Sequence, residues 1–349
     1  MPVAEPPIDR GGVYAALYGT VALLPDRYRT LVRGFVVNKF RGDPGLLGDA
    51  AAELGRRCGV PTLGVLPWLD DVALDAEDSL ALSGVRPGAG SPRVGDSLDV
   101  VAVRFPRMAN LTDLDALALE PGVEVRLVAD SRAVGRPDLV ILPGTKATVD
   151  DLAWLQDRRL DRAIAACGAL VLGICGGMQM MGRHITDHVE SGRGEVDALG
   201  WLDVSTGFGP DKVTRQRRGH AMGEEVSGYQ IHHGRVTRHE RAAAWIHLHD
   251  RYGHLDEGAV NVTDNRFLGT TLHGVFESDG FRAAFLTEVS RRAGKRFATA
   301  DHRRKRYGAS AQMSFAEARE AQFDRLADVV EDHLDHEALD DIIARGAPA

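Results

Sequence analysis

The chain has 349 residues, 44% of them hydrophobic and 26% charged, which are the proportions of a folded globular protein of about two domains. Acidic residues (50) outnumber basic ones (42), and the net charge of −8 argues against a nucleic-acid partner, which would require a basic face. No apolar run of about 18 residues occurs, so we expect neither a membrane span nor a membrane partner. The N-terminus lacks the pattern of a secretory signal, and the three cysteines form neither a disulfide framework nor a zinc spacing. A cytoplasmic protein is therefore expected.

Short β-branched runs alternate with helical stretches, which is typical of a parallel α/β architecture. In chain order, the predicted strands are 32–37, 62–65, 100–105, 123–128, 139–142, 169–172 and 268–272. The predicted helices between them are 46–58, 112–118, 148–155, 158–166 and 178–183. Residues 207–223, rich in Gly, Arg and Lys, are predicted to be an exposed loop, and 315–345 to form one or two amphipathic helices.

Composition shifts divide the chain into four regions. Residues 83–97 contain several glycines and prolines and little apolar sequence, so they are predicted to be a linker between a domain at 1–82 and a domain at 98–290. Residues 291–349 are predicted to be a helical extension. The first region offers only two or three strands, fewer than a doubly wound sheet usually has, and no G-x-x-x-x-G-K-[ST] phosphate loop occurs anywhere. We therefore expect a part of this domain upstream of Ile8.

The strongest chemical signal is Cys175, in a Gly-x-Cys-Gly-Gly pattern between a β run and a helix. This pattern is typical of a nucleophile elbow, a sharp turn that exposes the side chain above the sheet, with glycines for close approach. A helix N-terminus behind the sulfur favours the thiolate. Cys58 and Cys167 are expected to be buried core residues instead.

A thiolate requires a proton shuttle, and the best candidate is His273, which closes an apolar strand just before a glycine. At that position the ring can project at the carboxyl edge of the sheet, where α/β active sites lie. His232 and His233 are the rivals, and strand alternation puts one inward and the other outward. For each of them a role on the substrate side is one alternative, and a role as the base is less favoured. The remaining histidines lie among polar neighbours and are expected to be solvated. No metal site is predicted, although His247 and His249 come nearest to one.

An acyl-transfer site also needs donors for an oxyanion. The turn at 142–146 follows a strand, and the amides of Gly144 and Thr145 together with that of Gly176 are the candidates. In the first domain, Asn38 follows a buried strand and can read a purine edge with its paired donor and acceptor, although a turn asparagine is an equal alternative. Asp9 is the second nucleotide-site candidate, with a possible magnesium contact.

In these residues the sequence resembles the cobyric acid synthase family of glutamine-dependent amidotransferases. The matching segments run in the family's order and are 8–15, 17–20, 38–43, 63–67, 76–80, 104–107, 142–146, the Cys175 elbow, 228–232 and 273–277. The resemblance implies a partial dethiobiotin-synthetase-like (P-loop-type) domain followed by a class I glutamine amidotransferase (flavodoxin-like) domain. The family's phosphate-binding N-terminal part has no counterpart in this sequence, so we do not expect this chain alone to amidate.

The resemblance also implies a reaction. Cys175 attacks the carboxamide of glutamine, and His273 acts as general acid and base. ATP and Mg²⁺ activate the b, d, e and g side-chain carboxylates of adenosylcobyrinic acid a,c-diamide, and ammonia converts them into the amides of adenosylcobyric acid. Many class I glutaminases carry a Glu two residues after the histidine. Val275 stands there, which favours a Cys–His dyad, with Glu277 as a weak third candidate.

Two other enzymes and one other class of protein fit parts of this pattern. Cobyrinic acid a,c-diamide synthase shares both domain types, although segments 8–20 and 38–43 favour cobyric acid synthase. A free-standing cysteine hydrolase would use the Cys175 domain alone. A nucleotide-dependent positioning ATPase would require the phosphate loop and would not require Cys175.

Overall fold

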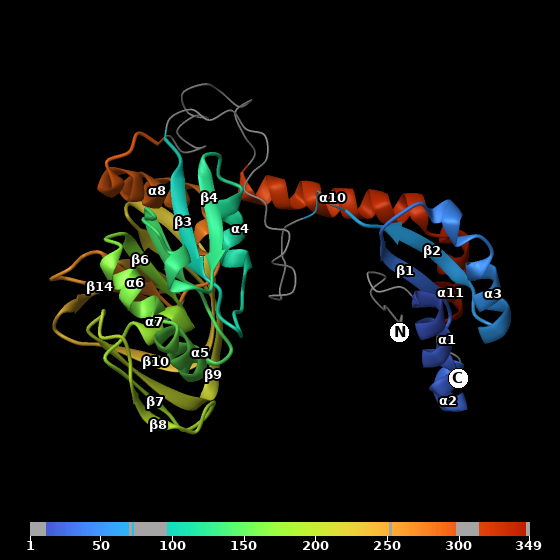
Figure 1. Cartoon of the computed structure of the whole chain (residues 1–349), viewed down its shortest axis with the longest axis horizontal. Coiled ribbons are helices and arrows are strands. Elements are labelled where there is room, and N and C mark those ends of the chain that lie inside the picture. The colour runs from blue at the N-terminus through green and yellow to red at the C-terminus, as the bar shows by residue number, and fades with distance from the viewer. Residues whose placement is uncertain (1–11, 70–71, 73–95, 251–252, 298–313, 347–349) are drawn as a thin grey trace. The chain divides into compact units, whose positions relative to one another are not determined.

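We describe the protein from a computed structural model. The structure describes residues 12–69, 72, 96–250, 253–297 and 314–346 (Figure 1). The chain forms two compact units. Unit 1 consists of Met1–Val72 and Arg319–Ala349, and unit 2 of Ala73–Ala318. The domain boundaries predicted above stay a prediction. None of the described helices is long and apolar enough to cross a membrane.

Unit 1 is built on a two-stranded parallel sheet. Its elements are α1 (Val13–Leu23), α2 (Asp26–Arg29), β1 (Phe35–Phe40), η2 (Pro44–Leu47), α3 (Ala50–Cys58), β2 (Thr62–Pro67), most of α10 (Phe315–His333) and α11 (His336–Arg345). Helix α1 buries Val13, Leu17 and Val21, spaced four residues apart on one face, against Phe35 of β1. The β1–α3–β2 order provides the crossover connection that a parallel pair of strands requires.

The C-terminal segment of the chain packs against β2 in unit 1. A side chain at Gly64 would collide with the carbonyl oxygen of His333, so the glycine allows Leu334 to form a bridge with this strand. Asp335 N donates to Leu63 O at 2.7 Å, and the Asp335 side chain accepts from Ala338 N and caps α11. The amphipathic helices predicted within 315–345 are confirmed as α10 and α11.

Unit 2 contains a seven-stranded sheet in the order β11-β14-β15-β6-β5-β3-β4. Its strands are β3 (Leu98–Val103), β4 (Val123–Val128), β5 (Leu139–Leu142), β6 (Leu170–Ile174), β11 (Ala242–Ala243), β14 (Ala259–Asn261) and β15 (Phe267–Thr270). The five strands from β15 to β4 are parallel. Strands β5 and β6 are buried along their whole length, which is the burial expected where helices cover both faces of a sheet.

Helices surround this sheet (Figure 1). They are α4 (Thr112–Ala118), η4 (Ser131–Ala133), α5 (Thr148–Asp157), α6 (Leu160–Ala166), α7 (Gly176–Met180), η5 (Val275–Glu277) and α8 (Asp279–Ala293). A second sheet has the order β13-β12-β9-β7-β8, with β10 paired to β9. Its strands are β7 (His184–Asp187), β8 (Gly194–Asp197), β9 (Val204–Ala221), β10 (Glu224–Arg238), β12 (Ile246–Asp250) and β13 (Gly253–Glu257).

The predicted strands and helices are confirmed, with ends that shift by a few residues, but the predicted loop at 207–223 is wrong. That segment belongs mostly to β9, which pairs antiparallel with β10 along almost its whole length. Met222 and Gly223 join the two strands, and both have positive φ, 55° and 82°, as a two-residue hairpin turn of type I′ requires. The polar composition that suggested a loop belongs to a strand whose side chains are mostly exposed.

Candidate active site

The candidate site lies where four neighbouring parallel strands end. Cys175 follows β6, and His273 follows β15, the strand beside it. The turn containing Gly144 and Thr145 follows β5, on the other side of β6. Next to β5 is β3, and the segment after it carries Asp113 in the first turn of α4. Because parallel strands deliver their carboxyl ends to one edge, these side chains meet although they are distant in sequence.

Cys175 occupies a strained turn between β6 and α7, with φ 52° and ψ −110°. Positive φ is uncommon for a residue other than glycine and strains the backbone at this turn. Its N–H donates to Thr270 O at 2.7 Å, and its side chain is 7% exposed. A Cβ at Gly176 would lie 2.8 Å from Thr145 Cγ2, and one at Gly177 would collide with Leu142 O. The two glycines therefore allow the elbow to approach the β5 turn.

The His273 imidazole is held by a carboxylate. Its Nδ1–H donates to Asp113 Oδ2 at 2.7 Å, and Asp113 Oδ1 accepts from Gly274 N at 2.7 Å. The two side chains are 1% and 0% exposed. Burial lowers the pKa of His273, whereas the charge of Asp113 and contact with Cys175 raise it, and the net pKa lies well above the usual value. A charged imidazolium beside the Asp113 carboxylate follows from this arrangement.

The sequence predicts a Cys–His dyad, with Glu277 as a weak candidate for a third member. In the structure, the carboxylate that contacts the histidine is Asp113. Asp113, from a helix more than a hundred residues upstream, occupies the position beside Nδ1 that Glu277 was considered for. Sequence reasoning missed Asp113 because an acidic residue in a first helical turn has an ordinary explanation in the helix dipole. The available signal was its place after β3, at the same sheet edge as Cys175.

Two further side chains contact the His273 ring. Tyr229 stacks on it with ring centroids 5.3 Å apart, and the two residues exchange backbone hydrogen bonds of 2.8 and 3.0 Å. Asn110 Nδ2 lies 3.2 Å from Nδ1 and 3.1 Å from Nε2, and Asn110 itself has a positive φ of 56°. A side chain at Gly228 would collide with His273 O, so that glycine brings Tyr229 to the ring.

The predicted turn amides lie at the same place. Two backbone hydrogen bonds join the β5 turn to the segment after β3: Ala109 N donates to Gly144 O at 2.9 Å, and Lys146 N donates to Arg107 O at 3.0 Å. The Thr145 amide lies between these two bonds and takes no part in this β-bridge. A Cβ at Gly176 would lie 3.2 Å from Thr145 N. The amides of Thr145 and Gly176 are thus close neighbours at the elbow.

His232 and His233 do not simply alternate, because a bulge lies between His232 and Gly234. Both are half-buried, and the Nδ1 atoms contact Gly234 O at 2.7 Å and Gly209 O at 3.1 Å, respectively. Burial, as the largest effect, lowers the pKa of His232. In the described part of the chain, His232 Nε2 and Gln179 Nε2 are buried without a hydrogen-bond partner. Gln179 follows Cys175 by one helical turn, and a Cβ at Gly234 would lie 2.5 Å from its Nε2.

The other predicted residues lie elsewhere. Asn38 is inside β1 of unit 1, where its Oδ1 accepts from Lys39 N at 2.8 Å, and Asp9 lies outside the described residues. The sequence contains no G-x-x-x-x-G-K-[ST] phosphate loop, the usual cradle for ATP phosphates. Cys58 and Cys167, expected to be fully buried, are only half-buried.

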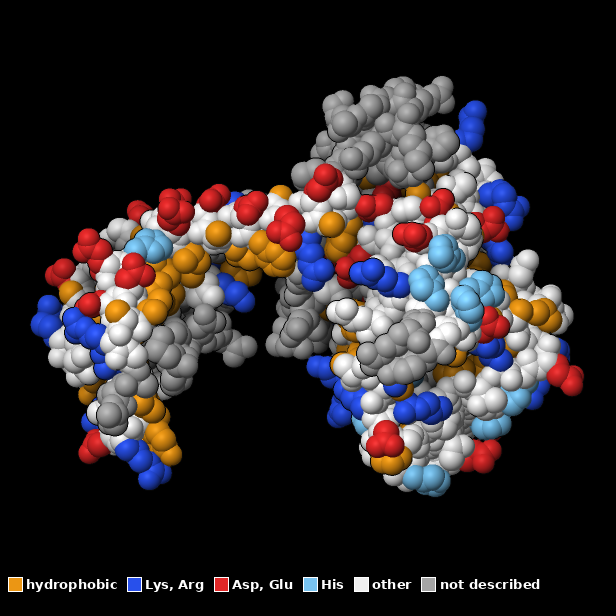
Figure 2. Space-filling view, turned by 180° about the vertical axis from the view of Figure 1, so that it is seen from behind, with side chains coloured by type: hydrophobic (Ala, Val, Ile, Leu, Met, Phe, Trp, Pro, Cys, Tyr) orange, Lys and Arg blue, Asp and Glu red, His pale blue; other side chains and the backbone are white. Residues whose placement is uncertain are grey.

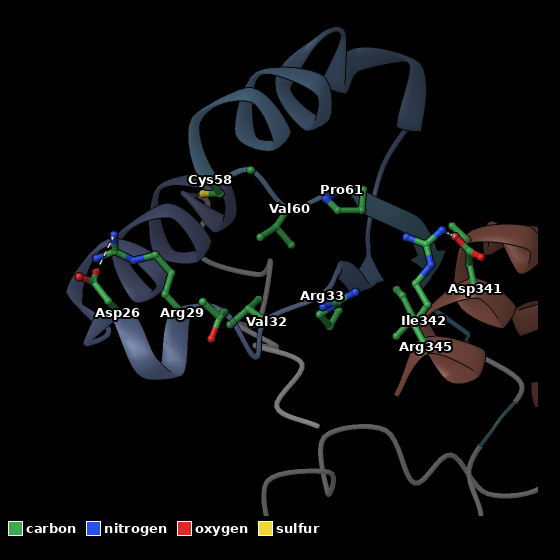
Figure 3. A pocket seen from close by; sticks show the side chains of 13 residues that line it. Asp26, Arg29, Val32, Arg33, Cys58, Val60, Pro61, Asp341, Ile342 and Arg345 are labelled. Carbon is green, nitrogen blue, oxygen red and sulfur yellow. Dashed lines mark ion pairs between the residues drawn. The ribbon is translucent and has the colours of Figure 1, made fainter. Parts of the chain in front are cut away.

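A cavity of about 720 Å³ lies in unit 1, between the N-terminal ends of its two strands and α11 (Figure 3). Its charged lining residues include two ion pairs, Asp26 with Arg29 and Asp341 with Arg345. Burial raises the pKa of the Cys58 thiol that lines this cavity. The cavity contains none of the predicted site residues.

Exposed histidines gather on the surface of unit 2 (Figure 2). His220 and His247 pair across β9 and β12, His249 pairs with His254 of β13, and the rings of His220 and His249 stack at 5.7 Å. Nowhere among the described residues do three His, Cys, Asp or Glu side chains lie close enough together to hold a metal ion.

Comparisons with known proteins identify the family of this chain. Residues 99–281 match the family described as CobB/CobQ-like glutamine amidotransferase domain. The chain is 48% identical to a cobyric acid synthase of Rhodococcus jostii over 98% of its length and 64% of the relative's. It is 48% identical to a cobyric acid synthase of Nocardia farcinica over 98% of its own length and 66% of that protein. The chain therefore spans about two thirds of the length of these relatives.

Solved structures of low identity also match. PurLQS from Thermotoga maritima matches with 17% identity and a TM-score of 0.43, covering 55% of this chain and 99% of that chain. A crystal structure of a glutamine amidotransferase matches with 15% identity and a TM-score of 0.42, covering 56% of this chain and 98% of that chain. The predicted resemblance to cobyric acid synthase and the predicted α/β glutamine amidotransferase domain are confirmed. The dethiobiotin-synthetase-like character of the first domain stays a prediction.

Proposed function

Because the chain belongs to the CobB/CobQ-like glutamine amidotransferase family, we propose that unit 2 hydrolyses glutamine with Cys175 as nucleophile and His273 as proton shuttle. The observation that carries the proposal is the combination of a strained cysteine elbow with a buried histidine whose Nδ1–H is held by a carboxylate. A buried imidazole fixed in this way presents Nε2 to the reacting atoms, which is the arrangement nucleophilic catalysis requires.

The reaction then proceeds in two steps. The Cys175 thiolate attacks the side-chain carboxamide carbon of glutamine, and the oxyanion formed accepts from the amides of Thr145 and Gly176. His273 donates its Nε2 proton to the departing nitrogen, which leaves as ammonia, and a thioester remains on the sulfur. Water then gives a proton to His273 and attacks the thioester carbon, releasing glutamate and restoring the thiolate.

The two unpartnered buried atoms near Gly234 support an amino acid as substrate. His232 is neutral because burial lowers its pKa, and its Nδ1–H faces Gly234 O, so Nε2 is an acceptor. Gln179 Nε2 is a donor. An acceptor for an ammonium group and a donor for a carboxylate are the complements of the α-carbon substituents of glutamine, and leaving both unsatisfied costs about 1–3 kcal/mol each.

The test is release of ammonia from glutamine by the purified chain, measured with and without ATP and a corrinoid. Hydrolysis that Cys175→Ser removes supports the proposal. Absence of hydrolysis under every condition contradicts it. Hydrolysis of unrelated amides at rates similar to that of glutamine would favour a free-standing cysteine hydrolase.

We further propose that the ammonia serves ATP- and Mg²⁺-dependent amidation of adenosylcobyrinic acid a,c-diamide to adenosylcobyric acid. The support is the name and identity of the relatives over 98% of this chain. The experiment incubates the corrinoid with ATP, Mg²⁺ and glutamine, using the chain alone or together with the unmatched third of the Rhodococcus relative. We expect a gain of four amides, read by mass, only in the second mixture. No gain in either mixture would contradict this proposal.

A further inference from the structure

Glu257 is a buried carboxylate that the proposed reaction does not use. It closes β13 and is 5% exposed. Its side chain accepts three hydrogen bonds, from Thr270 Oγ1 at 2.6 Å, Thr271 N at 2.6 Å and Thr271 Oγ1 at 2.8 Å. Burying a carboxylate is costly unless hydrogen bonds compensate it, and here all of these bonds go to two consecutive residues at the end of β15.

These two threonines lead directly to the active site. Thr270 O accepts from Cys175 N at 2.7 Å, and Thr270 Oγ1 accepts from Leu272 N at 3.0 Å. His273 is the next residue after Leu272. The single carboxylate of Glu257 therefore fixes a backbone segment that contacts the nucleophile at one end and carries the proton shuttle at the other.

The strain at Cys175 makes this support important. A non-glycine residue with φ near +52° is strained and persists only where its surroundings over-determine it. The bond from Cys175 N to Thr270 O is a constraint on that turn from the neighbouring strand.

A second contact braces the same segment from the long hairpin. Gln230 Nε2 donates to Thr271 Oγ1 at 2.6 Å, and Arg217 Nε donates to Gln230 Oε1 at 2.8 Å. Thr271 Oγ1 therefore accepts from β10 and donates to Glu257. This hydroxyl therefore links the segment before His273 to β10, whose Tyr229, one residue before Gln230, stacks on the His273 ring.

We propose that Glu257 is a positioning residue that holds the end of β15 so that Cys175 and His273 keep their reacting geometry. It touches neither substrate nor the reacting atoms, and it acts through Thr270 and Thr271. The proposal rests on the proposed function for its meaning in glutamine hydrolysis. The geometry at Cys175 is also measurable without glutamine, through the reactivity of the thiol.

The experiment compares Glu257→Gln with Asp187→Asn in the full chain. Asp187 is a matched control because it is another buried carboxylate of unit 2, 1% exposed, which accepts from the backbone N atoms of Val189, Glu190 and Ser191 at 2.8–2.9 Å. Alkylation of Cys175 by iodoacetamide is followed against pH by mass spectrometry. Cys167 lies on the same tryptic peptide, 163–183, and serves as the internal reference thiol.

We expect Glu257→Gln to slow Cys175 alkylation relative to Cys167 and to shift its pH profile, while Asp187→Asn leaves both unchanged. A loss of alignment of this kind also lowers kcat for glutamine by about 10–100-fold with little change in KM. If Glu257→Gln matches Asp187→Asn in the alkylation profile and in kcat, the proposal is overturned. If the wild-type chain does not hydrolyse glutamine, the proposed function fails, but the alkylation profile still decides the role of Glu257.

Where Glu257→Gln does not fold, Thr271→Val replaces it. This variant removes the hydroxyl that Glu257 and Gln230 share and keeps the amide that donates to Glu257. We expect the same shift of the Cys175 profile to a smaller extent. An unchanged profile in folded Thr271→Val overturns the proposal as well.

Discussion

The two units use the same local building block with different results. In unit 1, parallel strands β1 and β2 are joined through α3, and in unit 2, β5 and β6 are joined through α5 and α6. Unit 1 has two strands in its described sheet, whereas the larger of the two described sheets of unit 2 has seven. Among the described residues, only unit 2 sets several carboxyl ends side by side, and only there do a cysteine, a histidine and a carboxylate meet. The comparison shows that a strand–turn–helix motif provides one side chain, and neighbouring strands are required to complete a site.

The largest expected effect tests whether the chemistry belongs to unit 2 alone. Cys175→Ser should reduce ammonia release from glutamine by more than about 10³-fold, because an alkoxide forms far less readily than a thiolate at neutral pH. Cys167→Ser, which alters a half-buried thiol of the same unit, should leave the rate unchanged. Retained activity in the Cys175 variant would show that another nucleophile acts.

The next effect concerns the two histidines near the site. His273→Ala should lower kcat by about 10²–10⁴-fold, the usual contribution of a general acid or base. His232→Ala should cause a smaller loss, mainly in KM, because its unpartnered Nε2 is the acceptor proposed for the ammonium group of the substrate. Steady-state kinetics of both variants measure this order, and the reverse order would exchange their roles.

Asp113→Asn sharpens the comparison by removing only the negative charge of the α4 residue that follows β3. The amide retains an acceptor for Gly274 N and places an NH₂ group against His273 Nδ1, which selects the wrong tautomer. We expect a loss of roughly 10–10³-fold in kcat/KM. Asp113 is one of the groups that raise the pKa of His273, so its removal lowers that pKa. The alkaline limb of the pH–rate profile should therefore move to lower pH.

The same pair makes a prediction about stability. A histidine whose folded-state pKa is raised stabilises the fold fully below its unfolded pKa of about 6.5, and this contribution is lost as pH rises through the folded-state pKa. The difference in unfolding free energy between wild type and Asp113→Asn should thus be largest at acidic pH. A difference that grows with pH would contradict the assignment of the imidazolium.

The smallest effect on activity is expected from unit 1. Phe35 is fully buried there, and Phe35→Ala should destabilise that unit by about 3–5 kcal/mol. Hydrogen exchange of peptides from β1 and β2 should increase, while glutamine hydrolysis stays at the wild-type rate. A parallel loss of glutaminase activity would mean that the two units are not independent in this reaction.

Much of unit 2 is predictable because its central strands are nearly continuous apolar runs and its elbow has a distinctive pattern. The hairpin of β9 and β10 is not predictable in the same way. Its β9 strand is stabilised by pairing with β10 rather than by an apolar face. Its sequence therefore shows neither the two-residue hydrophobic period of a half-buried strand nor the 3.6-residue period of a helix. Its turn residues, Met222 and Gly223, provide the remaining local signal.

The site shows the same division between local and assembled features. Cys175 and the turn at Thr145 have local patterns, and His273 stands at a strand end, so all three are accessible to sequence reasoning. Asp113 and Glu257 are not, because each acts through a contact with a residue distant in the chain. The bulge at His232 likewise changes the alternation of β10 without a local warning in the sequence.

The glycines that bring the elbow against the β5 turn also limit how the enzyme can be redesigned. The wall facing Gly177 is the backbone at Leu142, and the wall facing Gly144 is the His273 ring itself. At these two positions the obstacle is main chain or the catalytic ring, so room for a bulkier amide cannot be made there without moving the main chain or losing the proton shuttle. Strand β10 offers His232 and His233 instead. A library that seeks new substrates has its freedom in that strand.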